Sequence, residues 1–358
     1  MYSHSGIGRY IRMLVSHMGQ VGKERPYRFV VFSPERFCQN GFDHAKSRSR
    51  PLSFWEQVDL GRYNLTAGLD LFHSPQFNIP LFSGTPQVTT IHDCAYAKYP
   101  EEFSSPADRL LHTVMFRLAI KRSRKIITVS QATKDDLAAM FRIPEDKLRV
   151  VHQGVDHRFW QEPKAEEAEV VKAGYGIHGD YLLYVGVTRP RKNVDRILRA
   201  FAALRDELPT GLKLVVAGPE DRRFLDIRKR AQDLGVAESV VLTGAVTDGE
   251  LRSLYRSALC LVFPTLYEGF GLPILEAMAS GTPVITSERP AHREVAGEAA
   301  LFVDPLEISD LTQAMVRIVN ERGLREELSE KGLARARMFS WERCARQTLS
   351  VYEEVLNG

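Results

Sequence analysis

Residues 263–285, which read FPTLYEGFGLPILEAMASGTPVI, contain the pattern with the clearest chemical content. Gly269 and Gly271 flank Phe270, and Pro273 stands where the first turn of a helix tolerates a missing N–H. Glycines let the backbone approach a ligand closely, and the start of a helix offers N–H groups and the positive end of its dipole. The arrangement predicts a turn that binds a diphosphate.

Two glutamates lie on either side of this turn. Glu268 precedes the glycines, and Glu276 lies within the first turns of the helix that follows. A carboxylate is unfavourable beside a phosphate unless it faces hydroxyl groups, so the pair suggests a ligand with hydroxyl-rich groups on both sides of its phosphates. A nucleotide-sugar is such a ligand. The alternative is an ordinary strand–turn–helix with one surface glutamate and one capping glutamate, and the spacing alone leaves both open.

Short apolar segments alternate with amphipathic helices along the chain, as is typical of parallel sheets covered on both faces. Strands are predicted over 27–33, 70–74, 87–93, 125–130, 148–154, 181–186, 213–218, 239–244, 260–264, 283–286 and 300–304. Helices are predicted over 107–123, 130–141 and 193–208, and from Trp341 onward. Ser130 is the expected N-cap of the second helix, and Ile197, Phe201 and Leu204 share one face of the third.

The predicted fold class is therefore α/β with two doubly wound domains. Residues 158–180 are acidic, contain Pro and Gly and have no strand signal, so they are predicted to link the domains. We expect a Rossmann-like domain over 1–165 and a second one over 175–338. The last helix, 341–358, has an apolar face with which it can pack back on the first domain.

Composition excludes several classes of protein. The 358 residues are 44% hydrophobic and 26% charged, and no apolar run is long enough to span a bilayer. Neither a secretory leader nor a C-x-x-C pair is recognisable, so Cys38, Cys94, Cys260 and Cys344 are expected to be reduced thiols of a cytoplasmic protein. A formal net charge of +3 does not predict nucleic-acid binding. The basic segments 44–50 and 116–125 are either solvated faces or patches that contact anionic lipid.

The segment SGIGRY places Gly6 and Gly8 just before a predicted helix, but almost no chain precedes them. A phosphate-binding glycine turn normally follows a buried strand. We therefore expect that the first strand of the N-terminal domain is missing from this sequence. A true start upstream of Met1 is the favoured explanation; the alternatives are that another segment takes the place of the strand or that the domain is impaired.

The segment around Glu268 and Glu276 resembles the E-x7-E signature of the family 4 retaining glycosyltransferases. Three further segments agree in the same order: SGIGRY, TTIHD (89–93) and YVGVTRPRKNV (184–194). The resemblance covers nearly the whole chain. It implies the GT-B fold, in which two Rossmann-like domains face each other across a cleft.

The resemblance also assigns roles at the E-x7-E turn. It implies that Glu268 binds donor-sugar hydroxyls and that Glu276 binds the nucleotide ribose. The backbone N–H groups of Phe270, Gly271 and Leu272 would meet the sugar and the diphosphate. Gly244, at the end of the strand over 239–244, resembles the segment whose backbone contacts the base, and Gly6 and Gly8 would approach the donor.

Four side chains are the expected catalytic residues: Glu268, Lys192, Arg189 and His92. Lys192, with Arg189 or Arg191, would neutralise the diphosphate as its bond to the sugar breaks, and fixed charges of this kind stabilise a transition state. Many family members have an arginine directly after the strand glycine or one residue later, where this chain has Val187 and Thr188, so Arg189 is shifted. His92 resembles a residue that contacts the donor sugar; a hydrogen-bonded turn is its alternative role.

The expected activity is retaining transfer of a hexose from a nucleotide-sugar to an acceptor hydroxyl. The acceptor would be a glycan or a lipid-linked glycan, at the inner face of the membrane. The PRKN and IHD segments most resemble those of mannosyltransferases of surface-polysaccharide assembly, which favours GDP-mannose as the donor. A UDP-sugar is the alternative donor. No D-x-D segment occurs, so no metal or other cofactor is expected. A non-catalytic partner subunit, a nucleotide-sugar epimerase of the same fold and an NAD-dependent oxidoreductase are the alternatives.

Overall fold

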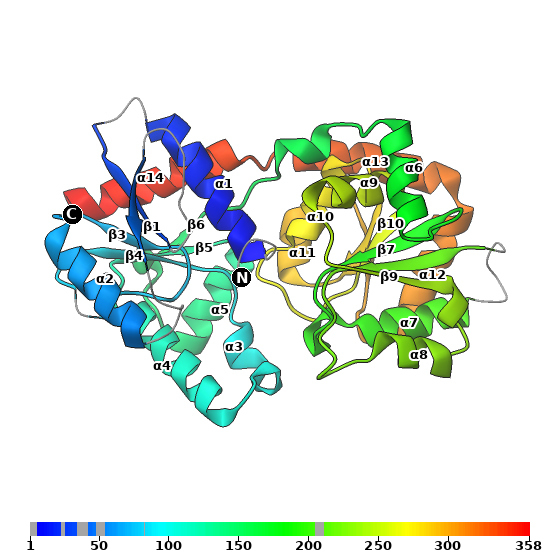
Figure 1. The fold of residues 1–358 in the computed structure, drawn as a ribbon, viewed down its shortest axis with the longest axis horizontal. Coiled ribbons are helices and arrows are strands. Elements are labelled where there is room, and N and C mark those ends of the chain that lie inside the picture. Colours follow the sequence, from blue (N-terminus) through cyan, green and yellow to red (C-terminus); the bar gives the residue numbers. More distant parts are fainter. Residues whose placement is uncertain (1–5, 23–25, 34–41, 48–53, 82, 205–210) are drawn as a thin grey trace. The chain divides into compact units, whose positions relative to one another are not determined.

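The computed structural model describes residues 6–22, 26–33, 42–47, 54–81, 83–204 and 211–358. The chain divides into two compact units, drawn as ribbons in Figure 1. Unit 1 comprises Met1–Gly154 and Ser340–Gly358, and unit 2 comprises Val155–Phe339. Residues 1–5, on which the prediction of a missing strand depends, lie outside the described residues, as do Cys38 and the end of the basic segment 44–50.

Unit 2 contains a six-stranded parallel sheet with the strand order β12-β11-β10-β7-β8-β9. This is the doubly wound Rossmann order, in which the chain starts in the middle of the sheet and winds outward in both directions. The direction of winding changes between β7 and β10, and ligands of such sheets bind beyond the carboxyl ends of the strands at this point. The strands are β7 (Tyr181–Val185), β8 (Lys213–Ala217), β9 (Val240–Gly244), β10 (Cys260–Phe263), β11 (Val284–Ser287) and β12 (Leu301–Val303).

Helices cover both faces of this sheet. In Figure 1, α7, α8 and α12 lie on one face and α6, α9, α10 and α13 on the other. Ile197, Phe201 and Leu204 are buried, as their spacing predicted. The helices of unit 2 are α6 (Ala165–Gly174), α7 (Val194–Ala203), α8 (Ile227–Asp233), α9 (Asp248–Ser257), α10 (Leu272–Ala279), α11 (Pro290–Ala296), α12 (Ile308–Asn320) and α13 (Arg322–Ala336).

Unit 1 contains a four-stranded parallel sheet in chain order and a separate parallel pair, β1-β2. The strands are β1 (Phe29–Ser33), β2 (Phe42–Lys46), β3 (Phe72–Ser74), β4 (Gln87–Ile91), β5 (Lys125–Thr128) and β6 (Leu148–Val150). The helices are α1 (Gly6–Val21), α2 (Phe54–Thr66), α3 (Ala95–Lys98), α4 (Pro106–Arg122), α5 (Gln131–Phe141) and α14 (Trp341–Asn357). α1 and α14 pack together on one face of the four-stranded sheet, and α4 and α5 lie on the other (Figure 1).

Two local features of the chain differ from the sequence predictions. Residues 158–180, predicted as a linker, contain α6, which packs on α9 within unit 2. Along the chain, unit 1 ends at Gly154 and unit 2 begins at Val155. The acidic, alanine-containing composition is that of an exposed helix: Lys172 pairs with Glu169, and Tyr175 donates to Glu250. Gly6 and Gly8 lie in the first turn of α1 and not in a loop before it.

One local prediction is confirmed at the start of α5. Ser130 caps α5 by accepting a hydrogen bond from the Thr133 N–H. Cys94, Cys260 and Cys344 are buried free thiols. Within the described part of the chain, no helix is both long enough and apolar enough to cross a membrane.

Candidate functional site

The loops that follow β7 and β10 lie at the change of winding direction of unit 2 and are joined to each other. Asn193 occupies the left-handed region, with φ +64°, at the start of α7. Its buried Nδ2 donates to the carbonyl oxygens of Pro264 at 2.9 Å and Pro305 at 2.7 Å. The Leu266 N–H donates to the Arg191 carbonyl at 2.8 Å. These bonds fix the two loops side by side.

Three charged side chains meet on these joined loops. Lys192 Nζ donates a hydrogen bond to Glu268 Oε1 and forms an ion pair with it. Arg191 Nη1 lies 3.6 Å from the same oxygen. Exposed fractions of the side chains are only 12% for Glu268, 13% for Arg191 and 15% for Lys192. Because these charges are largely removed from water, their interactions are stronger than those of a surface pair.

The pKa of Glu268 shows the net positive character of this cluster. Burial alone would raise it, but the charges of Lys192 and Arg191 outweigh burial and hold the pKa of the carboxyl below its usual value. Burial lowers the pKa of the nearby His292 to about 4, so this imidazole is neutral at physiological pH. Glu268 is therefore a carboxylate held by two cations.

Arg189 lies apart from this cluster. Its Nε is 3.9 Å from Asp221 Oδ2, and Asp221 is bound more closely by Arg223. Of the two arginines that the sequence left open, the structure places Arg191 beside Glu268 and Arg189 beside Asp221. The reason is local: Pro190 begins the one-turn helix Pro190–Lys192, which separates the two side chains.

The E-x7-E turn has the backbone that its glycines predicted. Gly271 is the N-cap of α10 and has φ +110°, in the left-handed region that favours glycine. A Cβ at this position would lie 3.0 Å from the Ile274 side chain and 3.6 Å from His292. Phe270 is buried, with its ring edge-on to Phe339. Leu272 starts the helix, so the N-terminal end of α10 lies on the same loop as Glu268.

Glu276 lies on α10 and is buried, with 2% of the residue exposed. Its Oε2 accepts a hydrogen bond of 3.1 Å from the hydroxyl of Tyr255, which is fully buried on α9. A buried carboxylate requires such partners. Tyr255 could not be predicted from the sequence, because an aromatic residue on an amphipathic helix has no signal that separates it from the core.

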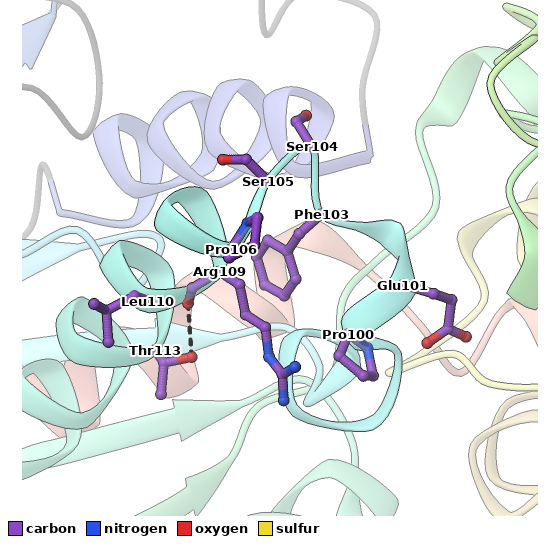
Figure 2. Close-up of a pocket in the computed structure, with 9 residues that line it drawn as sticks. All are labelled: Pro100, Glu101, Phe103, Ser104, Ser105, Pro106, Arg109, Leu110 and Thr113. Carbon is purple, nitrogen blue, oxygen red and sulfur yellow. Dashed lines mark hydrogen bonds between the residues drawn. The ribbon is translucent and has the colours of Figure 1, made fainter.

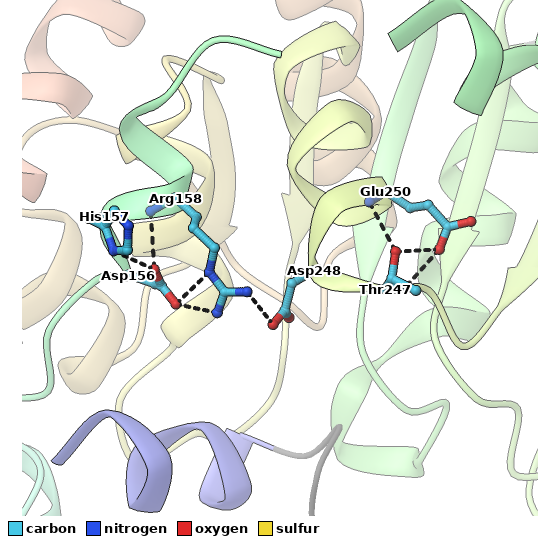
Figure 3. Close-up of polar contacts among 6 residues, drawn as sticks. All are labelled: Asp156, His157, Arg158, Thr247, Asp248 and Glu250. Atoms are coloured by element: carbon cyan, nitrogen blue, oxygen red, sulfur yellow. Dashed lines mark hydrogen bonds and ion pairs between the residues drawn. The ribbon is translucent and has the colours of Figure 1, made fainter. Parts of the chain in front are cut away.

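Gly244 ends β9 with φ +67°, and the helix after it is held by a polar network (Figure 3). Arg158 donates to buried Asp156 through Nε at 3.0 Å and pairs with Asp248 at 3.0 Å. Thr247 and Glu250 form a capping box at the start of α9. Burial would raise the pKa of Asp156, but its bonds to Arg158 lower it. Arg158, which joins the two parts of this network, was missed because it lies in the segment predicted as a linker.

In unit 1, His92 directly follows β4 and its two ring nitrogens both have partners. Nε2 is 2.9 Å from the carbonyl oxygen of Pro75, and Nδ1 is 3.2 Å from Gln153 Nε2. The Tyr10 ring lies nearly perpendicular to the imidazole, with ring centroids 4.7 Å apart. Asp93 accepts a hydrogen bond from the Ala95 N–H and so shapes the turn after the histidine. Gln153, at the end of the strand segment predicted over 148–154, was not singled out from the sequence.

A cavity of about 610 Å³ opens at the start of α4 in unit 1 (Figure 2). Its walls include Phe103, Pro106, Arg109 and Leu110, and none of the residues predicted for the donor site lines it. No group of three or more His, Cys, Asp or Glu side chains with metal-binding geometry occurs among the residues that the structure describes.

The cluster of unit 2 has the chemistry of an anion site with selectivity for hydroxyls. Two cations and the end of a helix attract a phosphate, while Glu268 and Glu276 offer carboxylate oxygens that accept hydrogen bonds from hydroxyls. All these groups come from the ends of β7 and β10 and from α10. The structure brings Glu268 and Lys192 into direct contact, and their roles toward a ligand stay predictions.

Comparisons with known proteins agree with this chemistry. A family described as "Glycosyl transferases group 1" matches residues 174–335, and one described as "Glycosyltransferase Family 4" matches residues 4–159. O-antigen chain mannosyltransferase B of Escherichia coli is 30% identical over 284 residues, which cover 79% of this chain and 74% of that protein.

Two solved structures show the same fold over nearly all of the chain. WaaG, a glycosyltransferase involved in lipopolysaccharide biosynthesis, is similar with a TM-score of 0.74 at 19% identity, over 97% of this chain and 96% of its own. HepE of Anabaena, in complex with UDP-glucose, is similar with a TM-score of 0.76 at 16% identity, over 98% of this chain and 96% of its own.

Proposed function

This chain belongs to the family 4 glycosyltransferases and has two Rossmann-like domains of the GT-B fold, and we propose that it transfers mannose from GDP-mannose to an acceptor hydroxyl in the assembly of a cell-surface polysaccharide. The observation that carries the proposal is the buried cluster of Glu268, Lys192 and Arg191 on the two joined loops of unit 2. Glu276, which lies on the adjacent helix α10 and accepts a hydrogen bond from Tyr255, is the fourth charged residue of the proposed site.

In the proposed reaction, the bond between the anomeric carbon and the diphosphate oxygen breaks first. Lys192 and Arg191 stabilise the negative charge that develops on the leaving diphosphate, and Glu268 turns from Lys192 to the sugar hydroxyls. The acceptor oxygen then bonds to the same face of the anomeric carbon, and its proton passes to the leaving diphosphate oxygen. This route retains the anomeric configuration. It uses fixed side-chain cations for the charge, so we propose that it proceeds without a metal ion.

The proposed donor follows from the more similar of the comparison proteins. The Escherichia coli relative at 30% identity is named a mannosyltransferase, whereas the structure with UDP-glucose is 16% identical. We therefore favour GDP-mannose and treat a UDP-sugar as the other outcome of the test. His92 keeps its predicted role as a contact to the donor sugar.

We also propose that α4 contacts an anionic membrane surface on which a lipid-linked acceptor lies. Leu110 is 65% exposed, and Leu111 and Val114 follow it on the outer face of the helix. The exposed cations Arg117 and Lys121 continue this face toward the end of α4. Apolar side chains that enter the bilayer boundary together with basic residues are typical of an interfacial helix. Figure 2 shows that Leu110 also lines the cavity at the start of α4.

The test of the reaction incubates the purified chain with radiolabelled GDP-mannose, UDP-glucose or ADP-glucose and a lipid-linked glycan acceptor. We expect label transfer and release of the nucleoside diphosphate with GDP-mannose, at the same rate with and without EDTA. The product should keep the anomeric configuration of the donor in its NMR spectrum. Transfer from UDP-glucose alone would contradict the proposed donor, and no transfer from any donor would contradict the proposed activity.

The test of the membrane contact is sedimentation with vesicles. We expect the chain to pellet with phosphatidylglycerol vesicles but not with phosphatidylcholine vesicles. Exchange of Arg117 and Lys121 for glutamate should abolish binding. As a matched control, exchange for glutamate of Arg322 and Lys331, which are exposed on α13, should leave vesicle binding unchanged. Equal sedimentation of both double variants would contradict the proposed surface.

A further inference from the structure

We propose that Gln153 is a positioning residue that fixes His92 as the neutral tautomer with its proton on Nε2, so that the ring near the reacting sugar carries no positive charge. This inference rests on the proposed function, in which His92 contacts the donor sugar. It starts from the partners of the two ring nitrogens, each of which the structure defines.

The partner of Nε2 determines where the proton is. A carbonyl oxygen can only accept a hydrogen bond, so at 2.9 Å from the Pro75 oxygen the His92 Nε2 must carry the proton. Burial lowers the pKa of His92, although Pro75 and the nearby Asp93 oppose this, so the ring holds a single proton. Nδ1 is then an unprotonated nitrogen that needs a donor. The amide of Gln153, which is only 4% exposed, supplies it at 3.2 Å.

The other groups around the imidazole do not replace this contact. The Tyr10 ring packs nearly perpendicular to the His92 ring, and the Tyr10 hydroxyl is hydrogen-bonded to Thr90. Thr133 hydrogen-bonds the carbonyl oxygen of His92 and not the ring. His73 lies near enough for the two imidazoles to interact electrostatically, and burial keeps it neutral as well. Asp93 is the only acidic group among the described residues that affects the pKa of His92, and Gln153 is the side chain that occupies Nδ1.

A neutral ring matters because of the charge that develops during transfer. Glycosyl transfer passes through a transition state in which the sugar ring becomes positively charged. An imidazolium next to that ring would destabilise the transition state, whereas a neutral ring would not. The glutamine amide favours the neutral form, since its N–H competes with a second proton on Nδ1. A carboxylate at position 153 would do the opposite and stabilise the imidazolium.

The direct test is a long-range 1H–15N NMR spectrum of the full-length chain with 15N-labelled histidine. His92→Asn identifies the His92 signals among those of the ten histidines. Between pH 6 and pH 8 we expect the wild-type ring to show a protonated Nε2 and an unprotonated Nδ1. A wild-type ring with its proton on Nδ1, or with both nitrogens protonated, would overturn the proposal without any variant.

Gln153→Glu provides the functional test. We expect both nitrogens of His92 to be protonated near pH 6, and kcat to fall about three- to tenfold below the wild-type value there, while KM for the donor changes less. The loss should shrink as the pH rises. Gln87→Glu is the matched control, because Gln87 is as buried as Gln153 but lies at the opposite end of β4.

Failure of this inference and failure of the proposed function give different results in these experiments. A wild-type spectrum of His92 in Gln153→Glu, or a pH profile that matches that of Gln87→Glu, would contradict the inference. Failure of the proposed function would instead appear as absence of transfer by the wild-type chain, and the NMR spectrum would still report whether Gln153 sets the proton on His92.

Discussion

At the scale of single residues, the two arginines of the β7 loop provide a sharp contrast. Arg191 lies 3.6 Å from Glu268, whereas Arg189 lies beside Asp221. We expect Arg191→Ala to lower kcat/KM for the donor about 100-fold, because a preorganised cation at the leaving group is lost. Arg189→Ala should lower kcat/KM for the donor less than about fivefold. Steady-state kinetics of both variants measure the difference, and a larger loss for Arg189→Ala would show that the cluster is assigned to the wrong arginine.

Tyr255 is expected to orient Glu276 toward the nucleotide. Tyr255→Phe removes the hydroxyl that donates to Glu276, so KM for the donor should rise, and the free energy of unfolding should fall by about 2 kcal/mol because the carboxylate loses a buried partner. Tyr181→Phe is the matched control: its hydroxyl is also buried but donates to the Leu254 carbonyl. It should reduce stability and leave KM unchanged. Equal KM values for the two variants would exclude the orienting role.

At the scale of elements, the E-x7-E turn depends on the left-handed backbone of Gly271. Gly271→Ala should lower the free energy of unfolding of unit 2 by about 1–3 kcal/mol, since φ +110° is strained for any residue with a Cβ. Gly249→Ala, in the first turn of α9, has no neighbour within 4 Å and should be neutral or slightly stabilising. Thermal unfolding of both variants tests this, and a neutral Gly271→Ala would mean that the turn adapts.

The elements themselves were largely predictable from sequence because their physics is local. The apolar runs at 181–185 and 260–263 are short and rich in β-formers, and both form strands that are buried in the parallel sheet. β2 was missed, since its FDHAK sequence is polar, and α6 was missed because an exposed helix has little apolar periodicity. Glu268 and Lys192 are 76 positions apart in the sequence, so no local pattern predicts that they pair. Only the family resemblance assigned both of them to one site.

The side chains that support the site could not be predicted in this way. Tyr255 and Gln153 each act through one hydrogen bond to a distant segment, and Asn193 acts through two. No periodicity in the sequence encodes such contacts. The choice between Arg189 and Arg191 likewise depended on the turn that Pro190 begins.

At the scale of the whole molecule, buried neutral histidines make stability depend on pH. Burial lowers the pKa of His73 to about 3 and that of His292 to about 4, and it also lowers that of His92. Unfolded histidines take up a proton near pH 6.5. Between about pH 6.5 and pH 4 the unfolded chain therefore binds protons that the folded chain does not, and the free energy of unfolding falls as the pH falls.

For His292 alone this loss should reach about 3 kcal/mol at pH 4. Thermal unfolding between pH 7 and pH 4 measures it, and His292→Gln, which cannot take up the proton, should flatten the dependence for unit 2. His178→Gln, at an exposed position, should not. If the free energy of unfolding falls equally with pH in the wild-type chain and in both variants, His292 does not contribute to the pH dependence of stability.

The proposed function requires that unit 2 binds a nucleotide-diphosphate sugar through the cluster on its β7 and β10 loops. Isothermal titration of GDP-mannose into the wild-type chain, Lys192→Ala and Lys331→Ala tests it without knowledge of the acceptor. Lys331 is the matched control, because it is an exposed lysine that also pairs with a glutamate, Glu327. We expect Lys331→Ala to bind like wild type and Lys192→Ala to bind at least about tenfold more weakly, because a charge-assisted contact to the diphosphate is lost. If Lys192→Ala binds GDP-mannose as tightly as the wild-type chain does, the cluster is not the binding site of the diphosphate.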